Sequence, residues 1–200
     1  LYLIPILVAS MTLHELAHAY VAMRLGDPTP REQGRLTLNP LVHLDPLGTA
    51  MFAVTYFLSN FLLGWARPVQ VDASYFRRPK QQMAIVAAAG PATNFLLALA
   101  FLAPLIHADL DGRLSAVAIL SYQVNLVLGI FNLLPIPPLD GSRIVGALMS
   151  DELYERWRAA DQYGMLAIFG VIVFFRQEFQ TLFTSAFDHS TRVMVEIVGG

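Results

Sequence analysis

Residues 10–23 read Ser10-Met-Thr-Leu-His14-Glu15-Leu-Ala-His18-Ala-Tyr-Val-Ala-Met23, and they close an apolar run that begins at Leu1. A bilayer core about 30 Å thick is crossed by roughly 20 apolar residues of helix. The run continues past the length of a signal-peptide core and has no cleavage-site pattern. We therefore expect residues 1–23 to form a membrane-spanning helix.

The pattern His14-Glu15-x-x-His18 lies inside this run. Its i, i+4 spacing places both imidazoles on one helix face, where they can bind one zinc ion. Glu15 reaches the edge of the same site and can take a proton from the attacking water. A chance match on a soluble helix is disfavoured, because a carboxylate at mid-bilayer costs about 2.5 kcal/mol or more and usually marks function.

The amino-acid composition further limits the class of protein. The chain is 56% hydrophobic and 14% charged, with a net charge of -2 and a mean hydropathy of +0.53. Such a chain belongs in a lipid bilayer, and without a basic stripe it is not expected to bind nucleic acid. It has no cysteine, so a metal site must use histidines and carboxylates.

Further apolar segments predict an all-α polytopic membrane protein with three core spans. The segments are Leu47 to Ala66, Met83 to Ile106, Leu114 to Leu134 and a shorter one, Ala159 to Phe175. Residues 34–40 alternate apolar and polar side chains, which predicts a short membrane-associated β-ribbon. We expect one domain over residues 1–200, with its core in about 1–150 and a helical tail in about 151–200.

A third zinc ligand is expected far from the first motif. Val21 and Arg24 stand where a metzincin would have Gly and His. At the end of the segment Leu114 to Leu134 three prolines interrupt the helix, and Asp140 follows them. Asp140 is either the third ligand or a capping residue at a plain helix stop. A Glu ligand would instead require Glu152 or Glu155.

Several motifs together resemble the site-2 protease family of intramembrane zinc metalloproteases. They are His14-Glu-Leu-Ala-His18, Gly90-Pro-Ala-Thr-Asn94, and Asn132 followed by Pro135-Ile-Pro-Pro-Leu-Asp140-Gly141. Residues 34–48 and Gly64-Trp-Ala-Arg-Pro-Val69 look like the small prokaryotic branch that lacks PDZ and CBS domains. The resemblance covers about residues 10 to 150.

The resemblance implies one zinc ion per chain, held by His14, His18 and Asp140. It implies that Glu15 is the general base and acid, that Asn132 lies near the substrate carbonyl, and that Gly90 and Asn94 lie close to the active site. The family cleaves membrane-anchored proteins within the bilayer, in regulated intramembrane proteolysis.

Topology places the site relative to the membrane. If all four long segments crossed, His18 and Asp140 would emerge on opposite faces. We therefore expect residues 47–66 to dip in and return, or to lie against the core. Ten of the Arg and Lys residues before the fifth segment then share one face, which the positive-inside rule makes cytoplasmic. The protein is expected in a prokaryotic plasma membrane, with Glu15 about 13 Å below that face.

Substrate contacts are less sharply defined. Leu36, Thr37, Leu38 and Asn39 are expected to offer an open edge on which an unwound substrate adds as a strand; the alternative is an amphipathic loop on the lipid surface. Gly90 and Asn94 are assigned to substrate binding through the resemblance, the alternative being small-residue helix packing. For Asn132 the choice is between an oxyanion donor and a helix-packing amide.

A different class of function also fits the first motif. In a catalytically inert transporter or scaffold, His14, Glu15 and His18 would form an ion or proton path. The other apolar segments lack the further charged residues that a relay needs. The sequence fixes neither the oligomeric state nor whether residues 176–200 cross the bilayer.

Overall fold

The computed structural model describes residues 2–58 and 64–199. Within these residues every regular element is helical. The α-helices are α1 Leu3–Arg24, α2 Thr29–Glu32, α3 Pro46–Leu58, α4 Pro79–His107, α5 Gly112–Asn132, α6 Asp140–Gly146, α7 Asp151–Ala159, α8 Asp161–Phe174 and α9 Arg176–Gly199. Two short 3₁₀ helices occupy Pro40–Val42 and Ala73–Tyr75. The predicted all-α fold class is confirmed.

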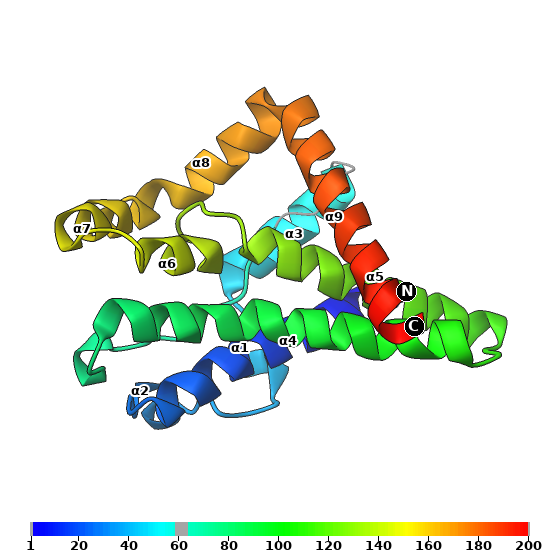
Figure 1. The fold of residues 1–200 in the computed structure, drawn as a ribbon, viewed down its shortest axis with the longest axis horizontal. Coiled ribbons are helices and arrows are strands. Elements are labelled where there is room, and N and C mark those ends of the chain that lie inside the picture. Colours follow the sequence, from blue (N-terminus) through cyan, green and yellow to red (C-terminus); the bar gives the residue numbers. More distant parts are fainter. Residues whose placement is uncertain (1, 59–63, 200) are drawn as a thin grey trace.

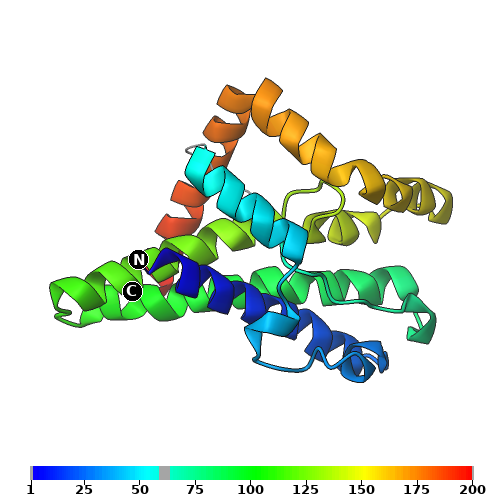
Figure 2. The same ribbon diagram turned by 180° about the vertical axis from the view of Figure 1, so that it is seen from behind.

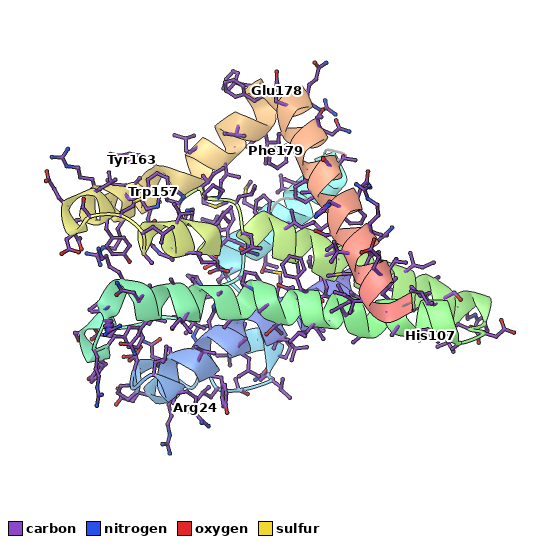
Figure 3. All side chains as sticks on the ribbon, in the orientation of Figure 1. Arg24, His107, Trp157, Tyr163, Glu178 and Phe179 are labelled. Atoms are coloured by element: carbon purple, nitrogen blue, oxygen red, sulfur yellow. The ribbon has the colours of Figure 1, made fainter. Side chains whose placement is uncertain are left out.

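Three helices, α1, α4 and α5, are long and apolar enough to cross a membrane. Their bounds agree closely with the predicted core spans, and α4 packs against both of the others (Figure 1). The ends of this bundle are well separated: Figure 3 labels Arg24, at the end of α1, at the lower left and His107, at the end of α4, at the right. The chain is therefore an integral membrane protein built on three core spans.

The core of the bundle is formed by apolar side chains of α4 and α5, mostly aliphatic. The buried cluster consists of Ala98, Leu102, Tyr122, Leu126, Ile130 and, from α9, Met194. Small residues let the α4 and α5 backbones approach closely, which is how helices associate in lipid. Pro91 and Pro104 lie inside α4, a position tolerated in membrane helices because neighbouring groups satisfy the freed backbone.

The segment between α1 and α4 leaves the core and returns to it (Figure 2). Helix α3 has 13 residues, fewer than a span requires. Leu44 and Ala66 form an isolated antiparallel bridge, and Arg67 N–H donates to the His43 carbonyl over 2.8 Å. Both ends of the excursion are thus joined, in agreement with the predicted re-entrant or peripheral segment. Part of the predicted range 47–66, residues 59–63, lies outside the described residues.

The predicted β-ribbon over residues 34–40 is wrong. These residues form bends that lead into the 3₁₀ turn at Pro40, and they pair with no strand in the described part of the chain. The local hydrogen bonds explain the difference. Asn39 Oδ1 accepts from Leu41 N–H, and the Thr37 hydroxyl accepts from Asn39 N–H, so side chains satisfy the backbone that a ribbon would pair.

Of the C-terminal helices, α6 and α9 pack against the bundle, whereas α8 contacts α7 and α9. The predicted fifth apolar segment appears as α8, and a bend of 95° separates it from α9, so the pair counts as at most a fourth span. Helix α8 rests on the proline-rich loop, because a Cβ on Gly164 would lie 2.2 Å from the Pro137 carbonyl oxygen. Helix α9 returns to the core, where Thr191 and Tyr122 share a hydrogen bond.

Candidate metal centre

One face of α1 carries buried polar residues at a spacing of four. Ser10, His14 and His18 are all less than a tenth exposed, and Ala22 continues the row. This face packs against α4 and α5. Glu15, on the adjacent position, is also buried. Helix α1 therefore turns the polar groups that would be most costly to expose to lipid toward the protein, and its apolar side chains outward.

The side chains of His14, His18 and Asp140 converge on one point. The two Nε2 atoms are 3.0 Å apart, and Asp140 Oδ2 lies 3.2 Å from His14 Nε2 and 3.3 Å from His18 Nε2. Tetrahedral zinc with ligand distances of 2.0–2.2 Å places its ligand atoms about 3.3 Å apart. The triangle therefore has the size that a zinc ion requires.

The outer nitrogens of both imidazoles are engaged by α4. His18 Nδ1 lies 2.8 Å from the Val86 carbonyl oxygen, which can only accept, so Nδ1 carries the proton. His14 Nδ1 lies 2.6 Å from Asn94 Oδ1. Each Nε2 therefore turns a lone pair toward the centre, which is the arrangement that second partners give to metal-binding histidines.

The centre is suited to a cation. Asp140 Oδ2 is buried and lies 3.2 and 3.3 Å from the two Nε2 atoms. When both imidazoles are neutral and carry their proton on Nδ1, three acceptors meet at this point and repel each other unless a positive charge lies between them. In the described residues no other group of histidines and carboxylates is arranged to hold a metal ion. The donor set suits zinc, which accepts both nitrogen and carboxylate oxygen ligands.

The proline-rich loop delivers Asp140 to this point. Residues 133–139 form turns, and Asp140 is the first residue of α6 rather than the end of a turn. Gly141 is required beside it, because a Cβ there would lie 2.1 Å from the Leu133 carbonyl oxygen. The loop thus folds back on the end of α5 and carries the carboxylate to α1.

Gly90 leaves room for the imidazoles. A Cβ at this position would lie 2.4 Å from His18 Nε2 and 2.5 Å from His14 Nε2. Asn94, one turn along α4, is fully buried. The sequence analysis assigned these two residues to substrate binding; in the structure Asn94 contacts His14 and is not among the residues that line the cavity beside the site.

Glu15 is held by a segment that the sequence analysis used only for the resemblance. The backbone N–H of Val69 donates to Glu15 Oε2 over 3.0 Å. Arg35, which is 3% exposed, donates to the carbonyls of Val42, Arg67 and Pro68 and so fixes this segment. The sequence offered one indication of this anchoring role, because Arg35 is a cation within the alternating stretch of residues 34–40.

The far end of this segment is anchored at Asp72. Its N–H donates to the fully buried Asp27, whose other oxygen accepts from Thr29 N–H. Hydrogen bonds from Ser74 hold the pKa of Asp72 below its ordinary value. Residues 64–72, hereafter the loop 64–72, are therefore tied down at both ends.

A cavity of about 1410 Å³ opens beside the metal centre. His14, Glu15, His18 and Asp140 line it, as do residues of the loop 64–72 and Asn132. One amide hydrogen of Asn132 is donated to the Leu128 carbonyl over 3.0 Å. Leu36, Thr37, Leu38 and Asn39 do not line the cavity.

Glu152 and Glu155 take no part in the centre. Glu152 pairs with Arg156 and Glu155 with Arg158, all four side chains being more than half exposed. The alternative of a glutamate as third ligand therefore has no support in the geometry.

Comparison with known proteins agrees with this centre. Residues 106–175 match the family described as "Peptidase family M50". The chain is 42% identical over 181 residues to YwhC of Bacillus subtilis. This alignment covers 86% of this chain and 80% of YwhC. YwhC is named as a zinc metalloprotease.

A second relative, Rip2 of Mycolicibacterium smegmatis, is 31% identical over 169 residues and is also named as a zinc metalloprotease. The alignment covers 82% of this chain but only 63% of Rip2, so the chain spans less than two thirds of that protein. No solved structure matches the chain significantly.

Proposed function

This chain belongs to peptidase family M50 and is a membrane zinc metalloprotease, and from that premise we propose that it cleaves transmembrane segments of membrane-anchored proteins within the bilayer. The proposal is carried by one observation: the paired imidazoles of a membrane-spanning helix and the carboxylate of Asp140 converge within 3.3 Å. Hydrolysis is thereby assigned to a place inside the membrane bundle.

We assign zinc binding to His14, His18 and Asp140. Zinc in such a site supplies a Lewis acid that polarises the scissile carbonyl and makes water a nucleophile near neutral pH. The protein's part is orientation. Val86 and Asn94 aim the two imidazoles, and the start of α6 brings the carboxylate.

Glu15 is assigned as the general base and acid. It lines the cavity next to the first metal ligand, where it takes the proton of the attacking water and passes it to the leaving amine. The N–H of Val69 holds one of its oxygens and leaves the other for the proton.

Asn132 is assigned to the developing oxyanion. Its amide nitrogen has two hydrogens, and the bond to the Leu128 carbonyl uses one of them. The second remains available in the cavity, where a preorganised donor stabilises negative charge.

The substrate enters as an unwound strand, because a peptide bond inside a helix has its carbonyl and amide already paired. We keep residues 36–39 as a substrate contact outside the cavity, made through side chains such as Leu38, which is two thirds exposed. We propose that the site lies nearer the cytoplasmic face of a prokaryotic plasma membrane, because Arg24 ends α1 and Arg77, Arg78 and Lys80 lie at the start of α4.

The test uses the full chain in proteoliposomes with two probes, a single-span transmembrane peptide and soluble casein. Zinc per chain and cleavage are measured for the parent and for Glu15→Gln. We expect zinc in both proteins and cleavage of the transmembrane peptide by the parent alone. Cleavage of casein but not of the transmembrane peptide overturns intramembrane proteolysis, and undiminished cleavage by Glu15→Gln overturns the role of Glu15.

A further inference from the structure

Four polar residues are sealed inside the membrane bundle behind the metal centre. Their exposures are 4% for Ser10, 0% for Asn94, 2% for Ser121 and 1% for Asn125. Burying an amide or hydroxyl without a partner costs about 1–3 kcal/mol by mutational measures. Only Asn94 among them contacts a proposed zinc ligand. The other three call for an explanation of their own.

These residues form a continuous chain of hydrogen bonds that ends on His14. Asn94 Nδ2 donates to Asn125 Oδ1 over 2.9 Å. Asn125 Nδ2 donates to the Ser10 hydroxyl over 3.0 Å and to the Ser121 backbone carbonyl over 2.9 Å. The chain thus links α5 through α4 to α1.

The direction of every hydrogen bond in this chain follows from the Ser121 backbone carbonyl at its far end. A backbone carbonyl can only accept, so the group of Asn125 that faces Ser121 is the NH₂. The carbonyl end of Asn125 must then face Asn94 and accept from it. Asn94 consequently turns its own carbonyl to His14 and requires a proton on Nδ1.

We propose that Asn125 is a positioning residue that sets the tautomer of His14 through Asn94. The inference rests on the proposed role of His14 as a zinc ligand. His18 needs no such relay, because the Val86 carbonyl fixes its Nδ1 proton directly. For His14, the Ser121 carbonyl determines which nitrogen carries the proton, acting through the side chains of Asn125 and Asn94.

The tautomer matters because a proton on Nε2 would occupy the position of the metal. A neutral imidazole can carry its proton on either nitrogen, and the hydrogen bond at the other nitrogen decides between them. Loss of an outer partner of this kind typically lowers metal affinity by 10–100-fold. Asn125 therefore acts on zinc binding without touching the ion.

The experiment compares three variants of the full chain in detergent. Asn125→Leu removes the relay, while Asn125→Asp keeps its acceptor for Asn94 and, as a neutral carboxylic acid, donates its single O–H to the Ser121 carbonyl, giving up only the bond to Ser10. Ser121→Ala is the matched control, since it retains the backbone carbonyl. Zinc affinity is measured by chelator competition, and ¹⁵N-histidine NMR of the zinc-free protein reports which nitrogen of His14 is protonated.

We expect Asn125→Leu to bind zinc about tenfold or more weakly and to lose the single Nδ1–H tautomer of His14. Asn125→Asp and Ser121→Ala should resemble the parent in both measurements. Parental affinity and tautomer in Asn125→Leu would overturn the relay. If Asn125→Leu does not fold, a changed tautomer in Asn125→Asp overturns it.

His14→Ala separates this inference from the proposed function. Unchanged zinc affinity in His14→Ala shows that the metal site itself is misassigned. Weakened affinity in His14→Ala with parental behaviour in Asn125→Leu shows that the site is right and the relay is wrong.

Discussion

Val69 donates its backbone N–H to Glu15 Oε2 over 3.0 Å, although 54 positions separate the two residues in the chain. The bond joins the proposed general base to the loop 64–72, which lines the same cavity. Hydrogen bonds to charged groups contribute about 1.5–3 kcal/mol. The loop is therefore part of what orients the carboxylate.

Replacing Val69 by proline removes this donor. We expect Val69→Pro to lower kcat by about tenfold or more, because Glu15 loses a charge-assisted bond, while zinc per chain stays at the parental value. Steady-state cleavage of a transmembrane peptide and metal analysis measure the two effects. Val69→Ala keeps the N–H and should behave like the parent; a parental kcat in Val69→Pro would show that the bond is dispensable.

Arg35 anchors the same loop through three carbonyls. Arg35→Met should destabilise it by about 1.5–3 kcal/mol for each hydrogen bond to the charged guanidinium that is lost. Limited proteolysis in detergent is expected to cut residues 64–72 faster in this variant. Arg31→Met, at an exposed position, serves as the control. Equal cutting of both variants would contradict the anchoring role.

Gly90 is the position at which a single methyl group should abolish metal binding. In Gly90→Ala the Cβ would overlap both imidazole Nε2 atoms, so we expect zinc to be lost and proteolysis with it. Gly170→Ala places its Cβ in open space on α8 and should retain zinc. Stoichiometric zinc in Gly90→Ala would mean that the histidines bind the ion in another arrangement.

Asp140 should be indispensable for zinc and Glu152 should not. Asp140→Asn removes the charge that offsets the ion, and we expect its zinc affinity to fall by more than the roughly 10–100-fold seen for outer partners. Glu152→Gln is expected to bind zinc like the parent. Chelation of the parent should abolish cleavage and added zinc should restore it. Full zinc occupancy in Asp140→Asn would exclude Asp140 as the third ligand.

The absence of cysteine permits a clean topology map. Single cysteines at Leu41 and Gln70 should react with an impermeant thiol reagent from one side of the membrane, and a cysteine at Asp109 from the other. Inside-out and right-side-out vesicles distinguish the sides. Reaction of Leu41 and Gln70 from opposite sides would show that residues 47–66 cross the bilayer.

The spans and the metal triangle were predictable for a simple reason. Hydropathy over about 20 residues is a strong local signal, and His14, Glu15 and His18 lie together on one turn of helix. Asp140 was reachable because Pro135, Pro137 and Pro138 mark a break in the helix at membrane depth. The proposed topology rests on the requirement that His18 and Asp140 share one ion.

The supporting contacts were not predictable from the same signals. Val69 acts through its backbone N–H, so its side chain carries no trace of the role. Asn125 is an ordinary polar residue in an apolar helix until its neighbours are known. Residues 34–40 alternate like a strand, but a ribbon needs a partner, and Asn39 and Thr37 satisfy the backbone locally instead.

The division of the proposed zinc ligands between α1 and the start of α6 has a consequence for biosynthesis. Both imidazoles lie on α1, which precedes α4 and α5 in the chain, and the carboxylate of Asp140 is translated only after α4 and α5. Because metal affinity depends on the complete ligand set, we expect hydrolytic activity to arise only once α1, α4, α5 and α6 have assembled.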